Sequence, residues 1–482
     1  MPPILPRPMK ADIAGAPADQ ESAMARDVSD TTPISSRSEL VSWLEEGCKP
    51  GGPFLLGTEH EKFAYYLDDL SPVPYEGRAG RGGIAALLEG VQAQTGWEPI
   101  MDEGSLIGLF DGAGGGAISL EPGGQFELSG APLDNVHETQ RELRNHLDLV
   151  NAIAEKHGIG FLGLGMSPSW RLDETPNMPK SRYRIMKNYM PKVGSRGLDM
   201  MYRTCTVQVN VDFRSEADMV RKLRVSLALQ PIATALFANS PFTDGAPNGL
   251  QSARSEIWRD TDNHRAGMMA FAFEDGFGFE RYVDWAIKVP MYFVKRGQTY
   301  HDVAGADFRH LLDGKLGALP GERATMSDWA NHLSTIFPEV RLKRYMEMRG
   351  ADVGSAEHIV ALSAFFVGLL YDEDALLGAW DLVKNWSAQE RQKLRDDVPA
   401  LGFNAQIAGR SVRDIARDAL ALSRKGLTRR RRCDERGSDE SIHLEVLDER
   451  IARNRTAAQE LIELYKNEWK GSVAPVFQAC RL

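Results

Sequence analysis

Cysteine is scarce in this sequence, and its spacing excludes several classes of small, cross-linked protein. Among 482 residues there are only four cysteines, Cys48, Cys205, Cys433 and Cys480, and no two of them form a CxxC pair. A secreted disulfide framework, a zinc ribbon and a thioredoxin-like redox site all need closer or more numerous cysteines. We therefore predict reduced thiols that do not cross-link the fold.

An excess of basic residues and long apolar runs are also lacking. Lys and Arg total 57 against 67 Asp and Glu, and the net charge of −10 argues against nucleic acid as a partner. No apolar run approaches the roughly 20 residues that a membrane-spanning helix needs. The first residues contain no apolar segment of signal-peptide type, and early acidic residues argue against a transit peptide. We therefore predict a cytoplasmic protein with no membrane partner.

Loops that cradle phosphate groups are absent as well. The chain contains no Gly-Lys-Ser or Gly-Lys-Thr, and so no P-loop. Gly112 and Gly114 loosely fit a dinucleotide fingerprint, but a strand-like run follows them, whereas that fingerprint requires a helix. We interpret this segment as a surface turn.

The composition that is present is that of an ordinary globular chain, 43% hydrophobic and 26% charged. At roughly 150 residues per domain, the length alone suggests about three domains. Residues 1–34 are rich in Ala, Pro, Asp and Ser, and we predict a mobile tail. Strand-like runs and Gly/Pro-rich turns continue to about residue 355, and helical patterns dominate after it. This order indicates an α+β fold with a helical C-terminal third.

Short runs with strict alternation carry the functional signal. Between Arg203 and Phe213, the side chains of Thr206, Gln208 and Asn210 share one face of a strand, backed by apolar residues. An ordinary solvated face would carry Lys, Glu and Thr, whereas this one carries amides in series. We infer that something binds to this face.

Carboxylates mark the polar faces of three further runs. The first run has Glu59 and Glu61 on one face. The second has Gln125 and Glu127 on one face, with Glu121 just before the break at Pro122. The third has Glu347 on the same face as Arg349. A single such pair is more often solvated than metal-bound, but a half-buried cluster on several strands is costly unless a cation neutralises it. Oxygen ligands without a His/Cys set suit Mg²⁺, with Mn²⁺ possible, and Mg²⁺ commonly binds together with substrate phosphates. We predict an Mg-ATP-dependent enzyme with an antiparallel sheet beneath its site.

Longer motifs carry a family resemblance. In chain order they are GTEHEKF, SLEPGGQFELSG, MPKSRYRIMKNYMPKVG, DMMYRTCTVQVNVDF, FANSPF and FPEVRLKRYMEMRGAD. Together they resemble the plant-type glutamate–cysteine ligases, carboxylate–amine ligases related to glutamine synthetase, from about residue 36 to the C-terminus. The resemblance implies a curved, saddle-like antiparallel sheet of six strands surrounded by helices. It also implies one catalytic domain over residues 35–482 in place of three.

The activity that the resemblance implies is ATP-driven joining of the L-glutamate γ-carboxylate to the L-cysteine amine. The reaction passes through γ-glutamyl phosphate and is the first step of glutathione synthesis. Two alternatives are a ligase of the same mechanism with another acceptor amine and a catalytically silent nucleotide-binding relative. A one-methylene difference in the acceptor is worth only about 1–3 kcal/mol, so the sequence discriminates poorly between amines. We expect a monomer or a homodimer.

The resemblance also implies roles for individual residues. The implied metal ligands are Glu59, Glu61, Glu121, Glu127 and Glu347, and the implied catalytic residues are Glu347 and Arg349. The nucleotide would meet Gln125, Gln208 and Asn210, and the substrate pocket would contain Thr206, Arg182, Tyr183, Arg254 and Trp258, with Arg254 clamping a carboxylate. Plant members share regulatory cysteines, but this chain has Ala318 where their pattern suggests one. We therefore expect no plant-type disulfide switch.

Overall fold

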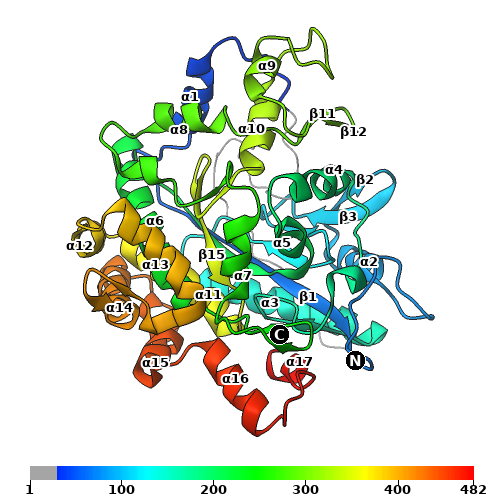
Figure 1. Ribbon diagram of the computed structural model, residues 1–482, viewed down its shortest axis with the longest axis vertical. Coiled ribbons are helices and arrows are strands. Elements are labelled where there is room, and N and C mark those ends of the chain that lie inside the picture. The colour runs from blue at the N-terminus through cyan, green and yellow to red at the C-terminus, as the bar shows by residue number, and fades with distance from the viewer. Residues whose placement is uncertain (1–29) are drawn as a thin grey trace.

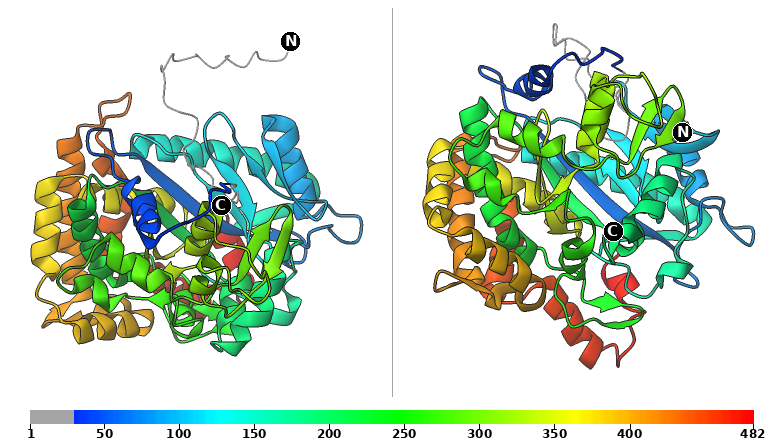
Figure 2. Two further views of the ribbon diagram at one scale, coloured as in Figure 1. Left: turned by 90° about the horizontal axis from the view of Figure 1, so that it is seen from above. Right: turned by 45° about the horizontal axis from the view of Figure 1, so that its top comes forward.

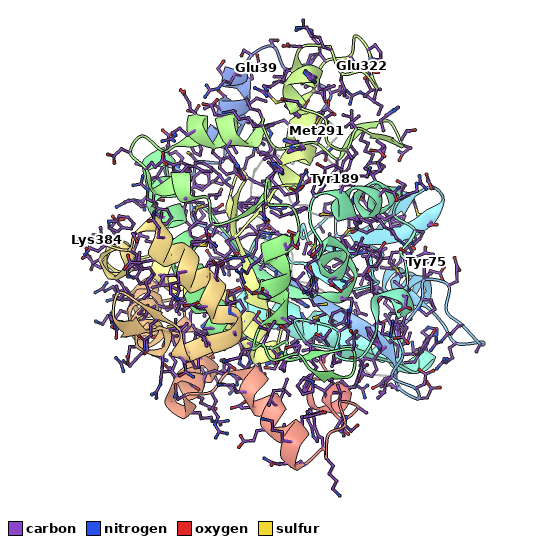
Figure 3. The ribbon with its side chains drawn as sticks, in the orientation of Figure 1. Glu39, Tyr75, Tyr189, Met291, Glu322 and Lys384 are labelled. Atoms are coloured by element: carbon purple, nitrogen blue, oxygen red, sulfur yellow. The ribbon has the colours of Figure 1, made fainter. Side chains whose placement is uncertain are left out.

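The computed structural model describes residues 30–482 (Figure 1). The mobile tail predicted over residues 1–34 falls mostly on residues 1–29, outside the described part. Its last residues are attached to the body, because Ile34 is buried and its backbone N–H donates to the carbonyl of Ala324 at 2.9 Å. In Figure 3 the nearby side chains of Glu39 and Glu322 accordingly lie at the same end of the molecule.

An antiparallel sheet of nine strands forms the centre of the molecule. Its order is β14-β15-β7-β1-β5-β4-β3-β2, and β6 pairs with the second half of β1. The strands are β1 (Leu56–Tyr66), β2 (Glu98–Asp102), β3 (Ser105–Phe110), β4 (Ala117–Leu120), β5 (Phe126–Ser129), β6 (Ile159–Leu162), β7 (Thr206–Val211), β14 (Val340–Leu342) and β15 (Met346–Asp352). The predicted antiparallel sheet is confirmed, but the count of six is wrong. The acid-bearing runs account for only some of these strands, and β2, β3 and β6 extend the sheet beyond them. The saddle-like curvature stays a prediction.

The turn at Gly112 and Gly114 joins β3 to β4, which pair as antiparallel neighbours. The backbone N–H of Asp111 donates to the carbonyl of Gly116 at 2.8 Å and closes the turn. No helix follows the glycines, so the interpretation as a turn is confirmed.

Helices surround the sheet and dominate the C-terminal third. Before that third they are α1 (Arg37–Glu45), α2 (Ile84–Thr95), α3 (Val136–Ala154), α4 (Ser181–Tyr189), α5 (Gly197–Arg203), α6 (Glu216–Leu236), α7 (Ala253–Ile257), α8 (Phe279–Ala286), α9 (Phe308–Leu312) and α10 (Met326–Ser334). After residue 355 they are α11 (Ala356–Leu370), α12 (Glu373–Val383), α13 (Ala388–Leu401), α14 (Val412–Arg430), α15 (Glu445–Arg453), α16 (Ala457–Asn467) and α17 (Val476–Ala479). The predicted change to helices near residue 355 is confirmed.

The apolar back of the sheet packs against α6 and α11. One buried cluster joins Val207 and Val209 of β7 to Phe365 of α11, so the helical third and the sheet share a core. Figures 1 and 2 show α12 and α14 along one side of the molecule, opposite α2 and the β2–β3 hairpin. Across residues 30–482, no helix combines the length and the apolar character needed to cross a membrane.

Four small two-stranded sheets lie outside the large one. They are β8 (Phe242–Thr243) with β9 (Ala246–Pro247), β10 (Ala266–Gly267) with β13 (Phe337–Pro338), β11 (Phe293–Arg296) with β12 (Thr299–Asp302), and β16 (Gln406–Ile407) with β17 (Arg410–Ser411). Of these, β13 and β11 each contribute a phenylalanine to the main cavity described below.

Candidate active site

Acidic and basic side chains together line one cavity, of about 140 Å³, over the polar face of the sheet. The acidic members are Glu59, Glu61, Glu121 and Glu127, and the basic members are Arg182, Arg341, Lys343 and Arg349. The other polar lining residues are Ser119, Tyr183, Gln208, Ser334 and Thr335. The structure thus brings together eight of the residues that the sequence singles out.

Strand register explains why residues far apart in the chain meet here. On β1, Glu61 lies directly opposite Glu127 of β5, and Glu59 lies opposite Gln208 of β7. Because side chains alternate between faces, these four project to the same side of the sheet. The neighbouring strand β15 then adds Arg349 to that side.

One neutral donor anchors each of the four cavity carboxylates. The pairs are Asn210 Nδ2 to Glu59 at 2.7 Å, the Thr206 backbone N–H to Glu61 at 2.8 Å, Tyr183 Oη to Glu121 at 3.2 Å, and Ser119 Oγ to Glu127 at 2.7 Å. The side chains of Arg341 and Arg349 pair with Glu347. The neutral donors therefore fix the orientation of the four carboxylates.

Burial and repulsion between neighbouring acids make Glu59, Glu61 and Glu121 hard to ionise. Burial, followed by the charges of Glu347 and Glu127, raises the pKa of Glu59 to about 8. Burial and the neighbouring acids likewise raise the pKa of Glu61 well above its ordinary value, and that of Glu121 also rises. A cation between them would favour the ionised forms.

The oxygen donors of this cavity suit Mg²⁺ that is bound together with phosphate and water, rather than Mg²⁺ held by protein side chains alone. Its acidic side offers only oxygen donors, which Mg²⁺ prefers. Within the described part of the chain, no three His, Cys, Asp or Glu side chains converge closely enough to hold a metal ion by themselves. Mg²⁺ usually binds through one or two carboxylates together with phosphate oxygens and water, and the donor set fits that mode.

Glu347 differs from the other acids because cations surround it. Its carboxylate is fully buried and pairs with Arg341 Nη2 at 2.7 Å, with Lys343 Nζ at 3.5 Å, and with Arg349. Burial alone would raise the pKa of Glu347, but these cations outweigh it and hold that pKa well below its ordinary range. Glu347 does not line the cavity, so its assignment as a metal ligand stays a prediction.

Three further residues singled out by the sequence lie behind the cavity wall. Gln125 accepts from the Gly123 N–H at 2.9 Å and donates to two backbone carbonyls, of Met201 and Thr204, at 3.2 and 3.0 Å. Thr206 Oγ1 donates to the carbonyl of Ala351 at 2.8 Å. Together with Asn210, which holds Glu59, these residues do not line the cavity, and here they position its wall.

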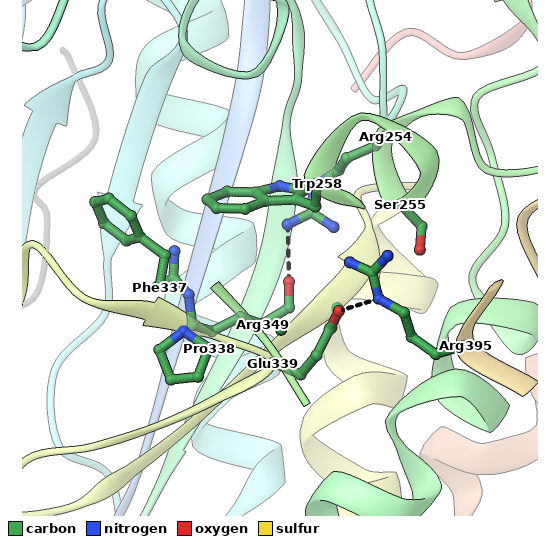
Figure 4. A pocket seen from close by; sticks show the side chains of 10 residues that line it. Arg254, Ser255, Trp258, Phe337, Pro338, Glu339, Arg349 and Arg395 are labelled. Carbon is green, nitrogen blue, oxygen red and sulfur yellow. Dashed lines mark hydrogen bonds and ion pairs between the residues drawn. The ribbon is translucent and has the colours of Figure 1, made fainter. Parts of the chain in front are cut away.

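The predicted substrate pocket is divided into two cavities. Arg182 and Tyr183 line the acid-lined cavity, whereas Arg254 and Trp258 line a smaller cavity beside it (Figure 4). Arg349 borders both cavities, and Arg254 Nη2 donates to its backbone carbonyl at 2.8 Å. The four residues thus lie around two adjoining cavities, and their roles in one substrate pocket stay a prediction.

Sequence reasoning missed Arg341 and Lys343. Arg341 lies opposite Glu347 in the β14–β15 pair, and both cations line the cavity. The alternation from Val340 to Lys343, next to a strand that carries Glu347, is the signal that could have found them.

Carboxylates suited to Mg²⁺ and several cations line one cavity over an antiparallel sheet, an arrangement typical of enzymes that act on phosphorylated ligands. The family model described as Glutamate-cysteine ligase family 2 (GCS2) matches residues 55–479. The chain belongs to this family, and the resemblance stated above is confirmed.

Relatives match over nearly the whole chain. The chloroplastic glutamate–cysteine ligase of Nicotiana tabacum is 51% identical over 97% of this chain and 86% of its own length. That of Brassica juncea is 52% identical over 97% of this chain and 87% of its own length. A crystal structure of glutamate–cysteine ligase from Francisella tularensis in complex with AMP shares the fold, with a TM-score of 0.50 at 12% identity, over 87% of this chain and 86% of that one.

The predicted cytoplasmic location is wrong by this comparison. Relatives that match 97% of the chain at about half identity carry the word chloroplastic in their names. Those names place the relatives themselves in chloroplasts. Composition could not reveal this, because location is read from a targeting signal and not from the folded core.

Proposed function

We propose that this chain is a glutamate–cysteine ligase, which joins the γ-carboxylate of L-glutamate to the amine of L-cysteine and converts ATP to ADP and phosphate. Membership in the ligase family over nearly the whole chain carries the proposal. A cavity in which oriented carboxylates face Arg182, Arg341 and Arg349 supports it.

The reaction needs two displacements. A γ-carboxylate oxygen of glutamate attacks the γ-phosphorus of ATP, the bond to the bridging oxygen breaks, and ADP leaves. The cysteine amine then attacks the acyl carbon, the bond to the phosphate oxygen breaks, and the amine proton passes to solvent. Arg349 and Arg341 would stabilise the negative charge on the transferred phosphoryl group, because fixed guanidinium donors need no reorganisation.

We propose that Glu59, Glu61, Glu121 and Glu127 supply the oxygen donors for Mg²⁺, bound through subsets of these carboxylates. When bound, Mg²⁺ neutralises phosphate charge and orients the phosphates for transfer. Gln208 would contact the nucleotide or glutamate, and Arg254 would hold a substrate carboxylate. Glu347 would act by fixing Arg341 and Arg349, with which it pairs.

We further propose that residues 35–482 work as one catalytic domain, since the helical third and the sheet share a core. Monomer and homodimer both agree with this proposal, and light scattering after size exclusion distinguishes them.

The test is ADP release by purified protein. We expect release to require glutamate, cysteine and Mg²⁺ together, and γ-glutamylcysteine to appear in equal amount by mass spectrometry. Release with glutamate and a different amine, but not with cysteine, would favour a ligase with another acceptor. Nucleotide binding without release under any of these conditions would favour a silent relative and overturn the proposal.

A further inference from the structure

A second, smaller cavity adjoins the acid-lined cavity and contains a guanidinium group that the sequence does not single out. Its volume is about 20 Å³, and its lining includes Arg254, Ser255 and Trp258 on one side and Arg395 of α13 on the other. Arg349 borders both cavities. A ligand in the acid-lined cavity could therefore extend past Arg349 into the smaller one.

The two guanidinium groups are deeply buried but only partly bonded. Arg254 and Arg395 are 3% and 5% exposed. Arg254 gives one terminal nitrogen to the carbonyl of Arg349, and Arg395 gives only its Nε, to Glu339 at 2.9 Å. Within residues 30–482, neither guanidinium has another acceptor. Figure 4 shows both groups directed into the same space beside Ser255.

The charge around this space is unbalanced. Three arginines line the space, Arg254, Arg349 and Arg395, whereas Glu339 is the one carboxylate among its lining residues, and it pairs with Arg395. Buried charges are costly unless they are paired and hydrogen-bonded. Unused N–H donors on two such groups therefore point to an anion that binds between them.

The chemistry and size of the space favour a carboxylate over a phosphate. A guanidinium donates two parallel hydrogen bonds to a planar carboxylate. A cavity needs roughly 10–15 Å³ to hold one water, so this space has room for a small planar group and not for a nucleotide phosphate chain. The ring of Trp258 forms one wall. An amino-acid substrate that reacts elsewhere keeps one free carboxylate of this kind.

We propose that Arg395 and Ser255, together with Arg254, bind the α-carboxylate of an amino-acid substrate, so that the helical C-terminal third contributes directly to substrate recognition. The inference rests on the proposed function. Glu339 acts as a positioning residue, because it holds the Nε of Arg395 and leaves the terminal nitrogens for the ligand. Glutamate and cysteine both carry an α-carboxylate, and the experiment below distinguishes them.

The experiment compares each substrate with its analogue that lacks the α-carboxylate. These analogues are 4-aminobutyrate for glutamate and cysteamine for cysteine. The ratio of kcat/KM between substrate and analogue is measured in the wild type and in Arg395→Gln. For the substrate whose carboxylate binds here, we expect this ratio to be about 10- to 100-fold lower in Arg395→Gln than in the wild type. Hydrogen bonds to charged groups contribute roughly that much. The KM for ATP should not change.

Three further variants distinguish loss of carboxylate binding from misfolding. Lys393→Gln removes a cation from the same helix at a side chain 70% exposed, and it should leave both ratios unchanged. Arg395→Lys keeps a charge beside Glu339 but cannot donate in parallel, and Ser255→Ala leaves both arginines intact. In each of these two variants the ratio of kcat/KM should be lower than in the wild type, but less so than in Arg395→Gln. Their folding is checked by thermal unfolding.

A reduced ratio for glutamate or for cysteine supports the inference and identifies the substrate. Ratios within about threefold of the wild type for both substrates, in folded Arg395→Lys and Ser255→Ala, would overturn it and leave water as the occupant. A wild type that releases no ADP with glutamate and cysteine would overturn the proposed function together with the inference. An active wild type with unchanged ratios would overturn the inference alone.

Discussion

Glu61 of β1 lies directly opposite Glu127 of β5 in the antiparallel ladder, and both carboxylates line the same cavity. Like charges in such a pair destabilise a sheet. Their neutral anchors, the Thr206 N–H and the Ser119 hydroxyl, orient the carboxylates without removing their charge. Two facing carboxylates are expected where a cation binds between them, because side-chain packing alone does not offset their repulsion.

Glu61→Gln should separate stability from activity. In metal-free buffer the variant should unfold with a free energy equal to that of the wild type or up to about 1 kcal/mol higher, because the repulsion is gone. Ligase activity should fall by about 100-fold or more, because charge stabilisation at the transferred group is lost. Denaturant unfolding and ADP release provide the two measurements.

The same variant tests the metal assignment. Mg²⁺ should raise the Tm of the wild type by mass action, and it should raise that of Glu61→Gln less. Glu45→Gln, at an exposed residue of α1, serves as the control. A Glu61→Gln variant with full activity and a normal response to Mg²⁺ would show that the ligand lies elsewhere.

Glu347→Gln should behave in the opposite way. The change leaves Arg341, Lys343 and Arg349 without their shared carboxylate, and breaking a buried ion pair costs about 3–5 kcal/mol. We expect a clear loss of unfolding free energy in metal-free buffer, together with loss of activity. Equal stability of Glu347→Gln and the wild type, by urea unfolding, would contradict the view that Glu347 fixes these cations.

Gln125→Leu should weaken the fold rather than nucleotide binding alone. Gln125 makes three hydrogen bonds to backbone groups, and its loss leaves two carbonyls and one N–H unsatisfied. At roughly 1 kcal/mol or more for each bond, we expect a loss of about 3 kcal/mol of unfolding free energy. A variant of wild-type Tm with a selectively raised KM for ATP would instead indicate direct contact with the nucleotide.

Acid should destabilise the protein through a buried histidine that does not line the acidic cavity. Burial lowers the pKa of His332 to about 4, while its Nε2 lies 2.9 Å from the carbonyl of Ala286. Between about pH 6.5 and 4 the unfolded chain binds a proton that the folded chain does not, so unfolding free energy falls as the pH falls. The contribution of His332 is on the order of 3 kcal/mol.

In His332→Gln, the free energy of unfolding should depend less on pH between about pH 6.5 and 4 than in the wild type. The measurement is urea unfolding at several pH values from 7 to 4, compared with the wild type. Parallel profiles for the two proteins would assign the acid sensitivity to other groups.

Much of the site was predictable because alternation along a strand is local. The positions of Glu59, Glu61, Glu127 and Gln208 on one polar face follow from period two, whatever the strand order. Arg341 escaped the same reasoning because its partner, Glu347, comes from the register of a hairpin. Arg395 could not be found at all, because nothing local connects its helix to Glu339 or Arg254.

The sequence by itself determined the class of fold, the family, the acid-bearing strand faces and the change to helices near residue 355. Only the tertiary structure decided that nine strands join the sheet, that cations surround Glu347, and that Arg349 divides the substrate region into two cavities. The physical reason is the range of the interactions. Side-chain periodicity depends on neighbours two to four residues away, whereas strand order, ion-pair partners and cavities depend on contacts between segments hundreds of residues apart.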